Sequence, residues 1–353
     1  MVTRENFNKK QNMNSLYKQL TRGPRRANIA LTDNTVTRSQ IRQLNEFDDI
    51  EDFGGPVAPN NTTYHKSKVV YVIKSGTSSE EGDIESPFKT IEDAVLELDN
   101  SKTQYNNFMI CILDNERYEL DIPLVLPKHT TLMGTNATID GYIVMENDDT
   151  HINIKRHICT DKFEDHDEYS LVRFDADNIS YKVGNISSQE APCFVVDSQA
   201  GIVSINFDVC QIASPNAVLD IVGEPSNAVV NIVGDKVLSV GSTDLFIITN
   251  TIERCKISID LNVVLINKPD NIESNVILFR KYDEIPGSNN LLTFTCNDVK
   301  ILHGDINASI NAVEDIDNIN TDGNNINVIW NVIDKDETVH SNATVKGNLI
   351  VIS

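Results

Sequence analysis

Short apolar runs recur in groups of three along the second half of this chain, and turn residues separate them without an intervening helix. The first group is "CFVVDSQAGIVSINFDVCQIA", and three similar groups follow it. The twelve run centres are Val195, Val203, Cys210, Leu219, Val230, Leu238, Phe246, Ile257, Val264, Ile277, Thr293 and Ile301. The first centres of successive groups lie 24, 27 and 31 residues apart. Such a repeat, with no helix in its unit, predicts a single-stranded parallel β-helix with three strands per coil.

In this architecture no strand has to be long, because each strand pairs with the equivalent strand one coil along, roughly 4.8 Å away. The stretch "PLVLPKHTTLMGTNATIDG", residues 123–141, fits one such coil. Apolar side chains should point inward, and turn residues such as Asn, Asp and Gly tolerate a positive φ. We expect these polar side chains to face the solvent: Asp220, Asn231, Ser239, Ser258 and Asp260.

The segment before the coils predicts one strand, from Val69 to Ile73, and one amphipathic helix. Ser86 is a candidate N-cap, and Pro87 would occupy the first helical position. The apolar stripe of this helix is Ile91, Ala94, Val95 and Leu98. A single helix followed by short strands is typical of a cap on the end of a strand-built core.

The order "VVYVIKSGT…SPFKTIEDAV…ICILDNERYEL…PLVLPKHTTLMGTNATIDG" resembles the start of right-handed, pectin-lyase-like β-helix proteins. In that superfamily a strand, an SG turn and a "PFxTIxxA" capping helix precede coils of the form "pLxlpxxxtLxG". The match covers about residues 68–141, and the coils from 191 to 303 are consistent with it. The resemblance implies an all-β, right-handed parallel β-helix. It leaves function open, because the superfamily includes lyases, hydrolases, phage tailspikes and inert shafts.

Charge divides the chain into a basic arm and an acidic body. Residues 1–45 carry nine basic side chains against two acidic ones, a net charge of +7, whereas the remaining 21 basic and 50 acidic residues give −29. The nine basic residues are Arg4, Lys9, Lys10, Lys18, Arg22, Arg25, Arg26, Arg38 and Arg42. We therefore predict an extended arm with an acidic Gly/Pro linker over residues 1–60 and a β-helix body over 61–353. Within the body we expect the first strand and capping helix over 61–122, coils over 123–310 and C-terminal strands over 311–353.

The arm cannot bury enough apolar surface to fold alone, so we interpret it as an anchor that becomes ordered on an acidic partner. That partner could be a nucleic acid, an acidic protein surface or the body itself; the alternative is a solubilising tail. Without aromatic residues interleaved among the basic ones, sequence-specific nucleic-acid binding is not expected. The N-terminus has no signal-peptide apolar region and the chain has no run of about 18–20 apolar residues, so we expect no membrane span and a cytoplasmic protein.

Catalytic residues do not emerge from the outward positions. Hydrolases of this fold need two or three Asp on adjacent coils, and the lyases need carboxylates that bind Ca²⁺ together with a basic residue. Asp220, Asp260 and Asp298 come singly and in different strand contexts. The sequence therefore predicts a protein without catalytic residues or a cofactor.

Two polar segments are weak candidates for a metal site. The segment "DKFEDHDEYS" places His166 among five carboxylates, and its candidate ligands are Asp165, His166, Asp167 and Glu168. The competing interpretation is a solvated loop. A second segment, with Asp315, Asp317 and Asp322, lacks the register and the closing Glu of a calcium loop, so we interpret it as a long turn. His129 and His303 each end a strand and are expected to be turn histidines.

Six cysteines lack CxxC or metal-ligand spacing. They are Cys111, Cys159, Cys193, Cys210, Cys255 and Cys296, and most of them lie inside apolar runs. We expect buried free thiols in a reducing compartment.

An arm followed by an acidic, Asn-rich β-helix also resembles structural proteins of large DNA viruses and phages. This resemblance implies a non-enzymatic virion protein, assembled in the host cytoplasm, that is capsid-associated or forms a fibre and binds other capsid proteins through its arm. The apolar terminal strands, "INVIWNVI" and "NATVKGNLIVIS", either cap the last coil or form a contact between subunits, so we expect a capped end or a homo-oligomer such as a trimer. The alternatives are a polysaccharide lyase or glycoside hydrolase, and a β-helix that binds a glycan receptor without cleaving it.

Overall fold

The computed structural model of the chain describes most of the predicted body. The described residues are 66–76, 82–102, 105–159, 170–189, 191–213, 216–240, 244–267, 274–281, 283, 287–303, 310–314, 324–333, 345–346 and 349–352. The predicted arm and linker, residues 1–60, lie outside them, and so does every basic residue predicted to bind a partner.

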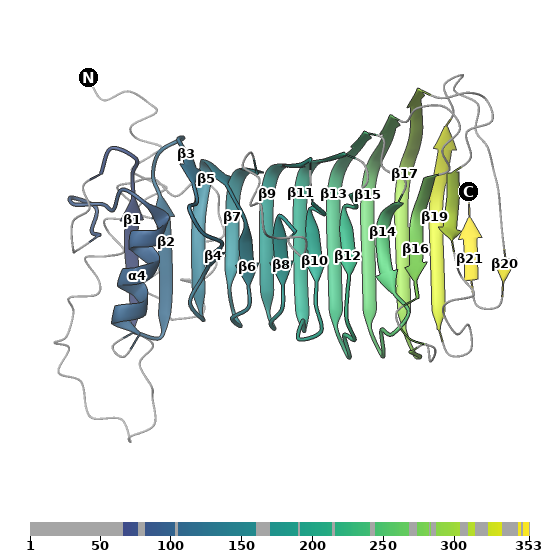
Figure 1. Cartoon of the computed structure of the whole chain (residues 1–353), viewed down its shortest axis with the longest axis horizontal. Helices are drawn as coiled ribbons and strands as arrows, with labels where there is room; N and C mark the ends of the chain where they lie inside the picture. The colour runs from purple at the N-terminus through teal and green to yellow at the C-terminus, as the bar shows by residue number, and fades with distance from the viewer. Residues whose placement is uncertain are drawn as a thin grey trace, which may run out of the picture.

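Most of the described chain forms two sheets that run along one axis (Figure 1). The larger sheet has 13 strands among the described residues and the smaller has 8. The larger sheet consists of β1 (Ser67–Val72), β2 (Asn107–Ile112), β5 (Thr130–Asp140), β7 (His151–Ile158), β9 (Ile179–Ser188), β11 (Ile202–Ala213), β13 (Val229–Val240), β15 (Lys256–Asn267), β17 (Leu291–His303), β19 (Asn325–Ile333), β21 (Leu349–Ile352) and β20 (Val345–Lys346), in that order, with β3 (Arg117–Glu119) beside β5. The smaller sheet consists of β4 (Leu124–Val125), β6 (Ile143–Met145), β8 (Val172–Phe174), β10 (Phe194–Val196), β12 (Leu219–Ile221), β14 (Asp244–Thr249), β16 (Ser274–Arg280) and β18 (Ile310–Glu314).

Strands pair with their equivalents one coil away, as the repeat predicts. β11 pairs in parallel with β9 and β13, and β10 pairs in parallel with β8 and β12. Among the described strands only β20 and β21 pair antiparallel. The stacked parallel strands are consistent with the predicted all-β, parallel β-helix class of fold.

The second and third predicted strands of a coil form one long strand that turns a corner. In β11, Val203 and Cys210 are both buried, but the alternation between them breaks where Asp208 and Val209 both face outward. The backbone ladder pairs Phe207 with the next coil and resumes at Val209, so Asp208 itself is skipped. We call the part before this residue the first limb of the strand and the part after it the second limb.

The same skipped position recurs in six consecutive long strands. We call these residues the corner column: Lys155, Gly184, Asp208, Asp235, Asn262 and Asn297. The phase change at the corner explains one wrong prediction. Ser239 lies beyond Asp235, and its side chain points inward, where it is fully buried and its hydroxyl has no hydrogen-bond partner among the described residues.

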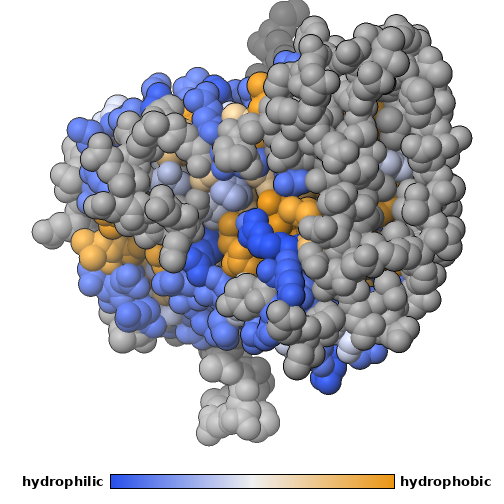
Figure 2. Space-filling model, turned by 45° about the vertical axis from the view of Figure 1, so that its right-hand side comes forward, coloured by the Kyte–Doolittle hydropathy of each residue, from blue (hydrophilic) through white to orange (hydrophobic). Residues whose placement is uncertain are grey.

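One continuous apolar core fills the space inside the coils, from Val70 to Trp330 among the described residues. Aromatic rings from neighbouring strands meet in its middle. The ring centroids of Tyr181 and Phe194 lie 5.9 Å apart, and those of Phe194 and Phe207 lie 6.0 Å apart. Each such buried side chain stabilises the fold by about 1.5–3 kcal/mol. In contrast, the outer surface in Figure 2 mixes hydrophilic and hydrophobic groups, and Ile202 and Val233 are about half exposed.

The single described helix, α4 (Ile91–Ser101), covers β1 and β2 at the N-terminal end (Figure 1). Its predicted stripe is confirmed, because Ile91, Ala94 and Leu98 are buried and Val95 packs against the core. Its predicted start is wrong. Thr90 is the N-cap and accepts a hydrogen bond from the Asp93 amide at 3.1 Å.

The residues just before the helix are not helical. The Ser86 amide donates to Asp83 Oδ1 at 2.6 Å, and the Phe88 amide donates to the Tyr71 carbonyl at 2.8 Å. Phe88 therefore lies beside β1 as an isolated bridge partner, and Pro87 cannot begin a helix there.

A residue with a positive φ lies in the turn before six of the long strands: β5, β7, β9, β13, β15 and β17. These residues are His129, Asp149, Asn178, Asn227, Arg254 and Asn289, with φ between 55° and 61°. The prediction that His129 is a turn histidine is confirmed. His303 is the last residue of β17, as predicted.

All six cysteines are free, and five of them are buried, as predicted; Cys159 is partly buried. Burial raises the pKa of Cys111 to about 12, and burial is also the largest cause that raises the pKa of Cys296 to about 12. A thiol with so high a pKa is rarely a thiolate near neutral pH and reacts slowly.

Candidate functional site

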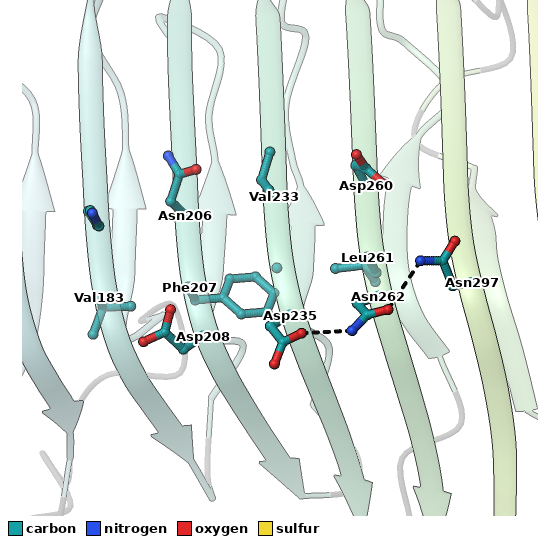
Figure 3. Close-up of a pocket in the computed structure, with 12 residues that line it drawn as sticks. Val183, Asn206, Phe207, Asp208, Val233, Asp235, Asp260, Leu261, Asn262 and Asn297 are labelled. Carbon is teal, nitrogen blue, oxygen red and sulfur yellow. Dashed lines mark hydrogen bonds between the residues drawn. The ribbon is translucent and has the colours of Figure 1, made fainter.

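A hollow in the described surface lies along the corner column. It is an open pocket of about 510 Å³ that crosses β9, β11, β13, β15 and β17 (Figure 3). Four side chains that line it come from the corner column, and others come from the ends of the first limbs. The polar lining residues are Lys182, Asn206, Asp208, Asp235, Asp260, Asn262 and Asn297.

Hydrogen bonds along the axis join three members of the corner column (Figure 3). Asn262 Nδ2 donates to Asp235 Oδ1 at 2.8 Å, and Asn297 Nδ2 donates to Asn262 Oδ1 at 3.1 Å. Both bonds point toward the N-terminal end, so the carboxylate is the final acceptor. Because adjacent hydrogen bonds polarise one another, the chain fixes the orientation of both amides.

The other two carboxylates of the pocket are differently placed. Within the described part of the chain, no hydrogen bond or ion pair joins Asp208 or Asp260 to another residue. Asp208 precedes Asp235 by one coil in the corner column, and Asp260 lies in the first limb of β15. These two carboxylates could therefore accept hydrogen bonds from a polar ligand in the pocket.

A glycine, Gly234, lies among the residues that line the pocket, between Val233 and Asp235. A Cβ on Gly234 would lie 2.2 Å from the Phe207 ring, which fills the space beneath it. The neighbouring Val233 is 51% exposed and gives the floor an apolar patch. Phe207 from one coil and Gly234 from the next thus pack as a complementary pair.

The three outward aspartates predicted from the sequence lie on three different faces. Asp260 faces the pocket from a first limb, and Asp298 lies on a second limb, 3.6 Å from Lys300 Nζ. Asp220 is in β12 of the smaller sheet. These three aspartates therefore do not meet one another, although Asp260 shares the pocket with Asp208 and Asp235.

Asp220 is buried, which corrects the prediction that it faces the solvent. Only 8% of the residue is exposed, and both carboxylate oxygens accept hydrogen bonds from Arg280 Nη1, at 2.9 and 3.1 Å. Burial raises the pKa of Asp220, while the charge of Arg280 opposes that shift. The pair joins β12 to β16 across the intervening strand β14, and this makes it a structural link.

The predicted metal ligands Asp165, His166, Asp167 and Glu168 lie outside the described residues, as do Asp315, Asp317 and Asp322. Within the described ranges, no three His, Cys, Asp or Glu side chains lie close enough together to hold a metal ion.

One histidine in the core escaped the sequence analysis. His157 is fully buried, its Nε2 lies 2.8 Å from the Gly141 carbonyl, and its Nδ1 lies 2.6 Å from the Tyr181 hydroxyl. Because a carbonyl only accepts, Nε2 must carry the proton, and the tyrosine hydroxyl donates to Nδ1. Burial lowers the pKa of His157 to about 4. Both ring nitrogens are occupied, so this is a structural histidine.

The corner column also escaped the sequence analysis, although a signal for it exists. Asp208, Asp235 and Asn262 are 27 residues apart, and each is followed by a residue that also faces outward. Two outward-facing residues in succession mark the point where the alternation of inward and outward side chains changes phase. A search for that change, rather than for strand centres, would have found the column.

The one described helix, α4, is too short to cross a membrane, and no helix of the described residues is long and apolar enough to do so. Comparison with known proteins finds no protein-family model, no curated protein and no solved structure that matches the chain.

Proposed function

We propose that this protein is a non-enzymatic structural module: a rigid, right-handed parallel β-helix of the pectin-lyase-like kind, anchored through its basic N-terminal arm. The observation that carries the proposal is the use of polar side chains on the corner column. Asp235 and its two asparagine neighbours bond to one another along the axis, which stabilises the stack. A catalytic carboxylate has to exchange a proton with a substrate, and Asp235 is instead bonded to Asn262; the unbonded Asp208 and Asp260 are the basis of the second candidate function below.

Right-handed winding is supported by the general rule for parallel strands joined by a crossover, about 98% of which are right-handed. The strand, SG turn and capping helix that resemble the pectin-lyase-like superfamily support the same winding. The acidic, Asn-rich body behind a basic arm supports a virion role, in which the protein is capsid-associated or part of a fibre, and is assembled in the host cytoplasm.

Partners of the module would bind through the arm. The contrast between +7 in residues 1–45 and −29 in the remainder supports an electrostatic tether to another capsid protein. The apolar terminal strands support a homo-oligomer, which light scattering on the purified protein would detect.

Deletion of residues 1–45 tests the proposal. The truncated protein should no longer associate with particles assembled in the host, while its melting temperature should stay nearly unchanged. A variant with all nine basic residues of the arm changed to Gln is the matched control for charge, and it should behave like the deletion. A marked fall in the melting temperature on deletion would place the arm within the fold and contradict the tether.

The dependence of association on salt concentration is a second test, because screening shortens the Debye length from about 10 Å at 0.1 M to about 3 Å at 1 M. Association through the arm should therefore weaken strongly over this range. Association that does not change with salt would contradict an electrostatic anchor.

A second candidate function is the binding of a glycan in the pocket. The observation that favours it is the free acceptor capacity of Asp208 and Asp260 on either side of the exposed Val233. An Asp208→Asn and Asp260→Asn double variant should then lose binding on a panel of immobilised glycans. Asp298→Asn, outside the pocket, is the control and should keep it. Equal binding by all three proteins would exclude the pocket.

A further inference from the structure

One coil in the middle of the solenoid contains two cysteines that face each other across the core. Cys193 comes directly before β10 of the smaller sheet, and Cys210 lies in the second limb of β11. Their sulfur atoms are 3.5 Å apart, and both residues are fully buried. No other residue has to move from between them for a bond to form.

The neighbouring coils show what these two positions ordinarily hold. Register places Leu171 and Ile186 at the same positions one coil earlier, and Val218 and Val237 one coil later. All four are buried aliphatic residues that only fill space. In the coil between them, both members of the cross-core pair are cysteine at once.

We propose that Cys193 and Cys210 form a disulfide under oxidising conditions, and that this bond locks the smaller sheet to the second limb of the larger sheet within one coil. The two cysteines are 17 residues apart in the sequence. A disulfide across such a loop stabilises a protein mainly by restricting its unfolded state. This inference does not rest on the proposed structural role.

The oxidant can be a small peroxide. One thiolate attacks a peroxide oxygen and displaces hydroxide, which leaves a sulfenic acid on that sulfur. The other thiolate then attacks this sulfur and displaces a second hydroxide, so the S–S bond forms. The two sulfurs together lose two electrons, and the two thiol protons complete two molecules of water.

Reaction should be slow in the native state, because both sulfurs are out of contact with solvent. Burial and the neighbouring Cys193 sulfur also raise the pKa of Cys210 well above its ordinary value. The coil has to open briefly before the peroxide can enter, and closing it again brings the sulfurs together.

The test uses the full-length protein, incubated natively with hydrogen peroxide and then blocked with N-ethylmaleimide in denaturant. Non-reducing peptide mass spectrometry should find Cys193 and Cys210 joined, with a loss of two hydrogens. The melting temperature should rise by roughly 5 °C and return to its starting value with dithiothreitol.

Two variants make the result specific. The Cys193→Val and Cys210→Val double variant reproduces the valine pair of the next coil, so it should fold, and peroxide should not raise its melting temperature. Cys111→Val removes an equally buried thiol elsewhere and should keep the full rise. Recovery of both cysteines as blocked thiols after oxidation, or a joined peptide without a rise in melting temperature, would overturn the proposal.

Discussion

Polar side chains inside the solenoid and polar side chains at its corner contribute to stability by different amounts. Inside, His157 and Tyr181 form a hydrogen-bonded pair that no water reaches. At the corner, Asp235 and Asn262 make a bond of similar length in full contact with solvent. Water can replace the outer bond when it breaks, but nothing can replace the inner one. The interior should therefore govern stability, whereas the corner should govern what the surface presents to a ligand.

The largest expected effect is acid destabilisation through His157. Its pKa is lowered to about 4, so the folded state binds fewer protons than the unfolded state, whose histidine has a pKa near 6.5. Its contribution is present above pH 6.5 and is lost as the pH falls toward 4, by about 3 kcal/mol in total. Urea unfolding at pH 7 and pH 4.5 would measure the change.

His157→Leu should flatten this part of the pH dependence, although it lowers stability at pH 7. Ile186→Val, which lowers stability without removing a titratable group, should leave the pH dependence as it is. An equally steep loss in His157→Leu would show that other groups cause it.

Tyr181→Phe should have the next largest effect. The substitution removes the hydroxyl that donates to His157 Nδ1 and leaves a buried acceptor without a partner, at about 1–3 kcal/mol. Chemical denaturation at pH 7 would measure it. A change below about 0.5 kcal/mol, the range of surface substitutions, would mean that the inner bond has a replacement.

Gly234→Ala tests the boundary between the two regions, because its Cβ would meet the Phe207 ring. Overpacking of this kind lowers stability by about 1–3 kcal/mol. Adding Phe207→Leu should recover part of the loss, since it removes the ring that the new methyl group meets. If the double variant is no more stable than the single one, the complementary pair does not control this site.

The smallest expected effect belongs to the corner. Asn262→Ala removes both bonds of the exposed chain, and we expect a change of no more than about 1 kcal/mol in the free energy of unfolding. Asn231→Ala, on the outward side of the first limb of β13, is the matched control. A loss as large as that of Tyr181→Phe would contradict the comparison between interior and corner.

Local patterns predicted the fold well because the repeat is local. The strand centres at Val195, Val203 and Cys210, one of each kind per coil, lie in the strands that the structure contains. Patterns could not show that the second and third centres share one strand, since a corner needs only two successive outward residues. They also placed the start of the helix at Ser86. The Ser86 amide instead donates to Asp83, and the helix begins at Ile91.

The site was harder to predict because its contacts depend on register between coils. Asp220 and Arg280 are 60 residues apart in the sequence. They meet because β12 and β16 lie in the same sheet with only β14 between them. Cys193 and Cys210 meet across the width of the core, which no spacing along the chain determines. Neither pair has a signature in the sequence until the coils are aligned in space.

The direction of the corner bonds has a consequence for how the chain is made. Asn297 donates to Asn262, and Asn262 donates to Asp235, so each later coil supplies a donor to an acceptor in the coil before it. Synthesis releases the earlier coil first, and domains generally fold from the N-terminal side as they emerge. Asp235 and Asn262 are therefore already synthesised when the residues that donate to them, one coil later, leave the ribosome.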